Sequence, residues 1–443
     1  MLKATFLLSV FASTKQNYMG KKVNFIVLML LVFASAFTAT NYQELSGSID
    51  KGDTAWMLVA CAFVLLMTPG LSFFYGGMIN KKNVISTMLQ SFVALGVISV
   101  LWVLIGFSLA FGDSIGGIIG NPFTYLNFKG VGIEPNPKFS STIPFLLFAL
   151  FQLKFAIITP ALITGSFAGR VRFRSYILFM VLFSLLIYSP LAHMTWHPDG
   201  LFRNWGVLDF AGGTVVHMSA GFAALAGAIY LGKRKVSVEV HANVPFVILG
   251  TGLLWFGWFG FNAGSALGAN GDAVIAFANT NIASATAMIT WLFYERMHGR
   301  KMSAVGACIG AVVGLVAITP AAGFVNIGQS MLIGFIAAIV SNGMIHLKNK
   351  SGIDDTLDVF PSHGIGGIVG MLLTAILAKD VGLIYGQTTT FVYHLIALAI
   401  TAVFTFGGSY LLFKIVDVLL KMRVREDQEE LGLDLSQHGE QIE

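Results

Sequence analysis

Residues 54–77 read TAWMLVACAFVLLMTPGLSFFYGG, an apolar run without a single charged side chain. A helix needs about 20 mostly apolar residues to cross the hydrocarbon core of a bilayer. Similar runs recur along the chain, which predicts an all-α membrane protein. We expect eleven membrane-spanning helices, at about 54–77, 84–111, 142–168, 175–195, 209–231, 244–264, 273–294, 303–319, 328–347, 360–378 and 389–417.

The composition agrees with a membrane protein. Of the 443 residues, 56% are hydrophobic and 11% charged, with a mean hydropathy of +0.77, whereas soluble domains carry about 25% charged residues. Cys61 and Cys308 lie in apolar runs, which favours packing over a disulfide or a metal site. We find no nucleophile triad, metal cluster or phosphate-binding loop. The sequence therefore predicts neither an enzyme nor a cofactor, metal ion or nucleic-acid partner.

The N-terminal region has the pattern of a secretory signal peptide. From Met19 the chain reads MGKKVNFIVLMLLVFASAFTA, in which two lysines precede an apolar core and small residues end it. We expect residues 1–36 to be removed, with Met19 as an alternative start of translation. The other interpretation of this region is an uncleaved extra helix. A transmembrane domain over 37–420 and a cytoplasmic tail over 421–443 would follow.

Basic residues in the loops predict the orientation, because cytoplasmic loops are enriched in Lys and Arg. Sixteen of them fall on one side of the predicted spans, within 81–82, 170–174, 233–235, 296–301, 348–350 and 421–425. The other side has Lys129, Lys138, Arg203 and Lys379. The first side should be cytoplasmic, with the mature N-terminus outside and the C-terminus inside.

An odd number of spans suits two inverted five-helix halves plus one extra helix, with the working site between the halves. A weak internal sequence repeat supports this arrangement. Asp209 precedes His217 in one half and Asp358 precedes His363 in the other, and each histidine is followed by a Gly-rich run.

Ionisable residues inside spans are costly and usually functional. His217 lies about 12 Å deeper than Asp209 along a helix, although a core histidine bonded to a backbone carbonyl would also fit. His363 lies near the cytoplasmic end of its span and meets His217 only if that helix entry is recessed. Asp209 and Asp358 begin their spans, so each could hold the local backbone. Lys154 could extend to the interface or pair with a carbonyl.

Aromatic residues surround these positions. They are Phe151, Phe155, Trp196, Trp258, Phe259 and Phe261. Aromatic faces attract ammonium-sized cations by about 0.5–2 kcal/mol, but most aromatic residues in membrane proteins pack or anchor, so spacing alone does not select among them.

Seven strings together resemble the ammonium transporter (Amt) family of the Amt/Mep/Rh superfamily. They run in order from the first span to the tail. The strings are MTPGLSFFYGGM (67–78), FAIITPALITGSFA (155–168), LDFAGGTVVH (208–217), GWFGFNAGSA (257–266), GACIGAVVGLVAITPAAG (306–323), DVFPSHGIGGIVG (358–370) and RVREDQEELGLDLSQHGE (423–440).

The resemblance implies eleven helices in two inverted halves, a homotrimer in the inner membrane, and one pore per subunit. Matching by residue implies an outer recruitment site at Trp196, Phe151 and Ser265, with Asp209 as a structural carboxylate nearby. It also implies a gate of Phe155 and Phe261. Below the gate, a pore lined by His217, His363 and Trp258 would follow.

The implied activity is ammonium transport for nitrogen uptake, with methylammonium as an analogue. A bare cation in an apolar tube costs many kcal/mol and neutral ammonia does not. We therefore expect deprotonation below the gate and net electrogenic transport of ammonia and a proton by separate routes. Potassium has no proton to lose and would be excluded.

Two other interpretations remain open. A Rhesus-type electroneutral ammonia channel shares the fold and the histidine pair, but Trp196, Ser265 and the tail argue against it. An ammonium sensor would need a separate partner, and the resemblance suggests a cytoplasmic PII-type signalling protein that contacts the 423–440 tail.

Overall fold

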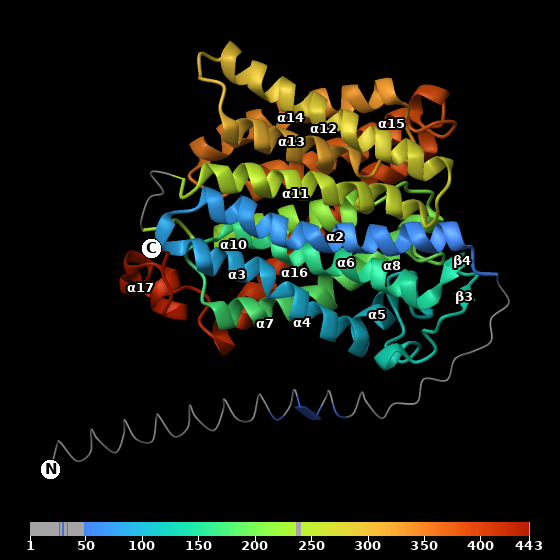
Figure 1. Cartoon of the computed structure of the whole chain (residues 1–443), viewed down its shortest axis with the longest axis horizontal. Coiled ribbons are helices and arrows are strands. Elements are labelled where there is room, and N and C mark those ends of the chain that lie inside the picture. The colour runs from blue at the N-terminus through green and yellow to red at the C-terminus, as the bar shows by residue number, and fades with distance from the viewer. Residues whose placement is uncertain (1–25, 27–28, 31–32, 34–47, 236–240, 443) are drawn as a thin grey trace.

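The computed structural model describes residues 48–235 and 241–442, together with Ile26, Met29, Leu30 and Phe33. The expected signal peptide over 1–36 therefore lies almost entirely outside the described residues. The described chain is a bundle of long helices with two short β-hairpins at one end (Figure 1).

Within the described residues, five segments in the first half and five in the second have the length and apolar character of a membrane span. Several contain a kink or a π-helical turn. In the first half the bounds are α2 (Lys51–Met78); α3 (Val84–Phe92), α4 (Ala94–Leu101), η2 (Trp102–Gly106) and α5 (Phe107–Phe111); α6 (Phe145–Ile163) with η4 (Thr164–Ser166); α7 (Phe173–Phe183), η5 (Ser184–Tyr188), α8 (Ser189–Trp196) and the short α9 (Leu201–Asn204); and η6 (Gly213–Met218) with α10 (Ser219–Leu231).

The second half ends in a folded tail. Its bounds are α11 (Val244–Ala263) with η7 (Gly264–Ala266), α12 (Gly271–Met297), α13 (Ala304–Ile318), α14 (Ile327–Ser351), η8 (Phe360–Ile365) with α15 (Gly366–Leu377), α16 (Thr388–Leu419), and in the tail α17 (Glu426–Leu431) and η10 (Asp434–His438).

Ten of the eleven expected spans thus have helices long and apolar enough to cross a bilayer, within the described residues. The eighth, expected at 303–319, is the shorter α13, which is apolar but only 15 residues long. α13 packs against both α12 and α14, and most of its residues are buried. The predicted orientation remains a prediction.

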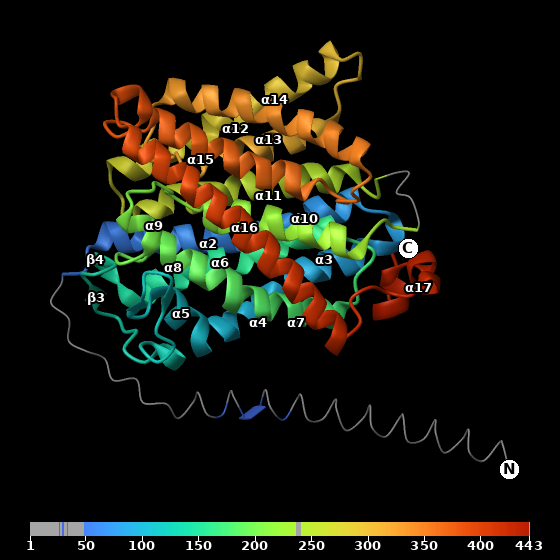
Figure 2. The same ribbon diagram turned by 180° about the vertical axis from the view of Figure 1, so that it is seen from behind.

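Glycines bring α2 and α11 into close contact, side by side in Figures 1 and 2. A Cβ on Gly250 would lie 2.3 Å from the backbone nitrogen of Phe74, and a Cβ on Gly257 would lie 2.6 Å from the carbonyl oxygen of Phe63. Small residues allow such backbone approach, which is how membrane helices associate without a hydrophobic driving force.

The two ends of the bundle differ. The β-hairpins lie at one end: β1 (Ser114–Ile115) pairs antiparallel with β2 (Ile119–Gly120), and β3 (Pro135–Asn136) pairs with β4 (Ser140–Pro144). α17 lies at the opposite end, and α16 crosses the back of the bundle obliquely (Figure 2). The candidate site described next lies between these two ends.

Candidate functional site

Asp209 organises the start of η6. Its carboxylate accepts hydrogen bonds from the backbone nitrogens of Gly212 (2.8 Å), Gly213 (2.6 Å) and Thr214 (2.8 Å), and from the Thr214 hydroxyl (2.5 Å). These groups are the free donors of a helix N-terminus. Asp209 therefore holds the backbone locally, as a carboxylate at this position should.

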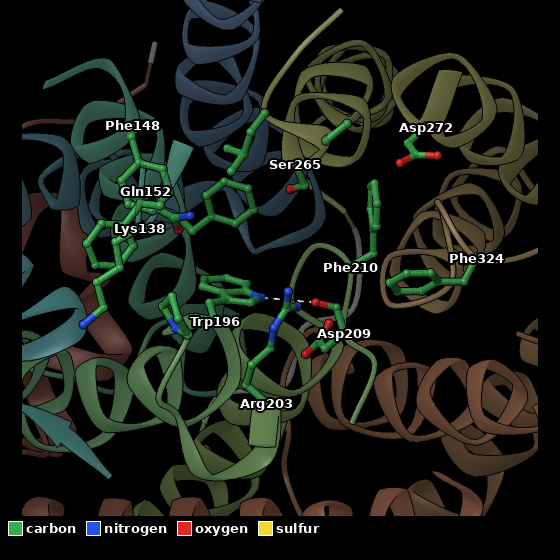
Figure 3. A pocket seen from close by; sticks show the side chains of 15 residues that line it. Lys138, Phe148, Gln152, Trp196, Arg203, Asp209, Phe210, Ser265, Asp272 and Phe324 are labelled. Carbon is green, nitrogen blue, oxygen red and sulfur yellow. Dashed lines mark hydrogen bonds between the residues drawn. The ribbon is translucent and has the colours of Figure 1, made fainter. Parts of the chain in front are cut away.

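A cavity of about 540 Å³ opens at the hairpin end of the bundle (Figure 3). Trp196 lies on its wall, and the indole nitrogen donates to the carbonyl oxygen of Asp209 (3.2 Å). The Ser265 hydroxyl, also on the wall, donates to the carbonyl oxygen of Phe261 (2.8 Å). Its oxygen lone pairs remain available to a donor in the cavity.

Packed aromatic rings form the floor of this cavity. The centroids of Phe155 and Phe261 are 4.3 Å apart, and Phe155 also contacts Trp196 (5.5 Å) and Phe151 (5.0 Å). Phe151, Phe155 and Phe261 are buried. The rings therefore close the path below the cavity.

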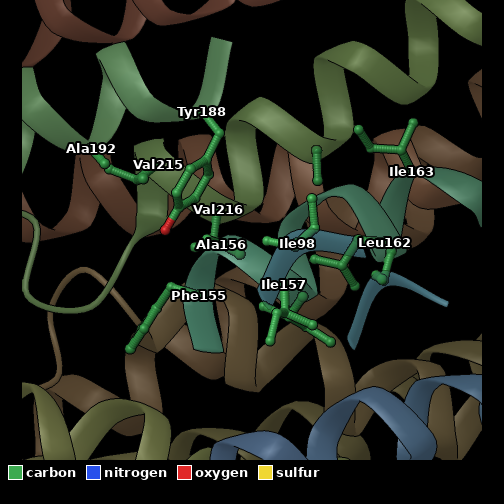
Figure 4. Close-up of a cluster of buried hydrophobic side chains, with 14 of the residues drawn as sticks. Ile98, Phe155, Ala156, Ile157, Leu162, Ile163, Tyr188, Ala192, Val215 and Val216 are labelled. Atoms are coloured by element: carbon green, nitrogen blue, oxygen red, sulfur yellow. The ribbon is translucent and has the colours of Figure 1, made fainter. Parts of the chain in front are cut away.

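The wall behind Phe155 is tightly packed. Tyr188 of η5 extends toward Val215 and Val216 of η6, with Phe155 and Ala156 of α6 nearby (Figure 4). All five residues are buried. This packing fixes the backbone beside the ring stack.

His217 and His363 meet beneath the stack, although they are 146 positions apart in the sequence. Their Nδ1 atoms are 3.3 Å apart, and both imidazoles are buried. His363 is thus recessed far enough to reach His217, the condition that the sequence left open. His217 also lies parallel to Trp258 (5.4 Å) and Phe261 (5.9 Å), so rings continue from the cavity floor to the histidines.

Thr319 orients the histidine pair and was not singled out from the sequence. Its hydroxyl donates to the carbonyl oxygen of Leu315 (2.8 Å) and accepts from the Trp258 indole (2.9 Å). Since its single proton is used, the contact with His217 Nε2 (3.3 Å) requires the histidine to donate. A neutral His217 then has a bare Nδ1, which accepts from His363 Nδ1–H and leaves His363 Nε2 as an acceptor.

The far end of the path has a second cavity of about 640 Å³, near the tail. Asp358 lines it but does not cap the helix that it precedes: it has φ +55° and pairs with Lys348. Asp355 caps instead, accepting from the nitrogens of Val359 (3.1 Å) and Phe360 (2.7 Å). Burial, and then the charge of Asp358, raises the pKa of the Asp355 carboxyl to about 6.

Two other residues lie away from this path. Phe259 stacks on Phe277 (4.0 Å), an exposed residue on the outer side of α12. Lys154 is half-buried and has no hydrogen bond or ion pair within the described part of the chain. No group of three metal-ligating side chains occurs among the described residues.

Many apolar spans, and a buried row of aromatic rings and two histidines between two cavities, are typical of a polytopic membrane transport protein. The sequence profile of the Ammonium Transporter Family matches residues 55–443. The chain belongs to this family, which confirms the resemblance seen in its motifs.

Relatives and solved structures agree. An "Ammonium transporter" of Aquifex aeolicus is 46% identical over 428 residues, covering 95% of this chain and 99% of that protein. One of Bacillus subtilis is 46% identical over 402 residues, covering 88% and 98%. The crystal structure of Candida albicans Mep2 superposes with a TM-score of 0.80 at 34% identity, covering 86% of this chain and 88% of Mep2. A "Sensor Amt Protein" superposes at 0.81 with 29% identity, covering 87% and 98%.

Proposed function

We propose that the chain transports ammonium across the inner membrane through the path described above. The observation that carries this proposal is the buried histidine pair directly beneath a closed aromatic stack, with a polar cavity above it. Relatives that the chain matches over most of their length are named ammonium transporters.

Recruitment takes place in the outer cavity. Trp196 lines the cavity and offers a ring face to the cation, worth about 0.5–2 kcal/mol, and Ser265 offers lone pairs to an N–H donor. Phe151 was expected at this site, but it is buried against Phe155 and does not line the cavity. The Asp209 carboxylate is occupied by four local donors. It acts on the cation through its field and the backbone it holds.

Passage requires the gate of Phe155 and Phe261 to open, because their rings are in contact. Below the gate an ammonium ion would lose its water in a dry, apolar tube at a cost of many kcal/mol. Releasing the proton removes that cost. Ammonia then crosses along Trp258, His217 and His363, where His363 Nε2 accepts one of its N–H groups, and the proton crosses by a separate route.

Currents test this mechanism. We expect proteoliposomes with the wild-type protein to give a current with ammonium and none with potassium, since potassium has no proton to release. The His217→Ala/His363→Ala double variant should lose the ammonium current or admit potassium. Ammonium uptake by the wild-type protein without an accompanying current would overturn electrogenic transport and favour a Rhesus-type electroneutral channel.

The proposed setting is a homotrimer with the N-terminus outside and the tail inside, after removal of residues 1–36. A tag at the C-terminus should be reached by protease only in inside-out vesicles. Native mass spectrometry should give three copies of the chain.

A sensing role through a PII-type partner is the second candidate, favoured by the similarity to a "Sensor Amt Protein". In that case well-folded protein would give no ammonium current. A purified PII-type protein would bind the tail face, and removal of 423–440 would abolish that binding.

A further inference from the structure

Two exposed charged side chains on the wall of the outer cavity have no partner among the described residues. Arg203 of α9 and Asp272 of α12 both line the cavity, and neither makes a hydrogen bond or ion pair through its side chain within the described residues. The other charged groups there have partners: Lys138 pairs with Asp199 (2.9 Å), and the Asp209 carboxylate accepts hydrogen bonds from backbone N–H groups.

The two free charges lie in different parts of the cavity. Asp272 lies on the side of Phe210 and Phe324, whose rings meet edge-to-face at 5.4 Å (Figure 3). Arg203 extends toward Trp196 and Asp209 (Figure 3). The cavity therefore has an acidic, aromatic part and a basic part beside the indole.

We propose that Asp272 and the Phe210–Phe324 ring pair form an outer binding site for small ammonium cations, and that the Arg203 guanidinium lowers the affinity of the Trp196 site for them. This rests on the proposed transport of ammonium. A carboxylate beside aromatic faces attracts a cation by charge and by ring quadrupole. The positive charge of the exposed Arg203 beside the Trp196 site repels the same cation. The two residues therefore change the affinity for the cation in opposite directions.

Both effects act on binding, because both residues lie above the closed ring stack and away from the histidines. A charge about 8 Å from the ion, in contact with water, changes its affinity by about 2- to 5-fold. Such an interaction is strongly screened once the Debye length falls from about 30 Å at 0.01 M salt to about 3 Å at 1 M. The apparent KM should change, Vmax should not, and salt should remove the difference.

The test is the initial rate of radiolabelled methylammonium uptake by proteoliposomes at low and high ionic strength. At low ionic strength Asp272→Asn should raise KM about 2- to 5-fold and Arg203→Gln should lower it by a similar factor. The double variant should return close to the wild-type KM. If the double variant instead has the same KM as Asp272→Asn alone, the proposed role of Arg203 is overturned.

Two control variants each remove a charge of the same sign at a residue outside the cavity. Lys129→Gln and Asp380→Asn change exposed residues on the same end of the bundle that do not line the cavity, and they should leave KM unchanged. Wild-type KM in both Arg203→Gln and Asp272→Asn, with normal uptake, would overturn this proposal alone. Absence of uptake by well-folded wild type would instead overturn the proposed function.

Discussion

At the scale of single residues, Thr319 decides which way the histidine pair presents its nitrogens. The Thr319 hydroxyl forms hydrogen bonds with three partners, Leu315, Trp258 and His217. A hydroxyl has one proton, so it can be the donor in only one of them. The shortest contact, to the Leu315 carbonyl oxygen, takes it. His217 must then donate through Nε2, and the bare nitrogen of the pair is at His363 Nε2.

We expect Thr319→Val to impair transport, because it leaves the N–H groups of Trp258 and His217 without their acceptor. A buried donor without a partner costs about 1–3 kcal/mol, and His217 would be free to adopt the other tautomer. Ammonium currents in proteoliposomes should fall about 10-fold or more.

Thr374→Val is the matched control. Its hydroxyl is buried and donates to the carbonyl oxygen of Gly370 on its own helix (2.8 Å), with no pore residue as partner. Equal loss of current in the two variants would contradict a specific role for Thr319.

At the scale of elements, the two histidines lie on two π-helical turns, η6 and η8. Each turn packs against the helix that continues from the other turn. η6 packs against α15 and η8 against α10. Glycines make the approach possible: a Cβ on Gly221 would lie 2.2 Å from the nitrogen of Gly364, and one on Gly367 would lie 3.0 Å from the carbonyl oxygen of Gly213. π-helical turns occur often at functional sites, and here they turn both imidazoles toward one point.

Gly221→Ala should therefore separate η8 from α10 and destabilise the protein. The added Cβ meets backbone atoms, which cannot move aside as a flexible side chain would. We expect a lower thermal unfolding midpoint in detergent and weaker ammonium currents.

Gly252→Ala provides the comparison within α11, because nothing lies within 4 Å of its added Cβ. There the exchange should stabilise the helix by about 0.5–1 kcal/mol. An unfolding midpoint for Gly221→Ala at or above that of the wild type would contradict the close packing.

At the scale of the whole molecule, the tail joins the starts of two helices that are far apart in sequence. Asp434 accepts from the nitrogens of Ile85 (3.0 Å) and Ser86 (2.7 Å) at the start of α3. Gln437 accepts from the nitrogen of Phe173 at the start of α7 (2.8 Å). In return, Asn83 accepts from the nitrogen of Leu433 (2.7 Å). The tail thus supplies the N-terminal caps that α3 and α7 lack locally.

Removing both caps, in Asp434→Ala/Gln437→Ala, should loosen this face of the bundle, since losing an N-terminal cap costs about 0.5–2 kcal/mol. Hydrogen exchange at the first amides of α3 and α7 should become faster. Asp427→Ala should have no such effect, because the one ion pair of Asp427 within the described residues is with the exposed Arg425. Unchanged exchange in the double variant would show that the tail does not support these helices.

The sequence alone was enough to predict the membrane class and most of the spans. A span is a local property, a run of apolar residues long enough for the bilayer, and ten of the eleven expected runs have helices of sufficient length. The capping role of Asp209 was predictable because it is local as well. Its carboxylate accepts hydrogen bonds from backbone N–H groups three to five residues further along the chain.

The tertiary structure alone decided the site. Whether His363 reaches His217, whether Phe259 faces outward, and whether Asp355 or Asp358 caps η8 depend on the depth and rotation of each helix. These are set by packing between segments far apart in sequence, above all by glycine contacts such as Gly221 with Gly364. Apolar composition places a helix in the membrane, but it leaves rotation about the helix axis to the neighbouring helices.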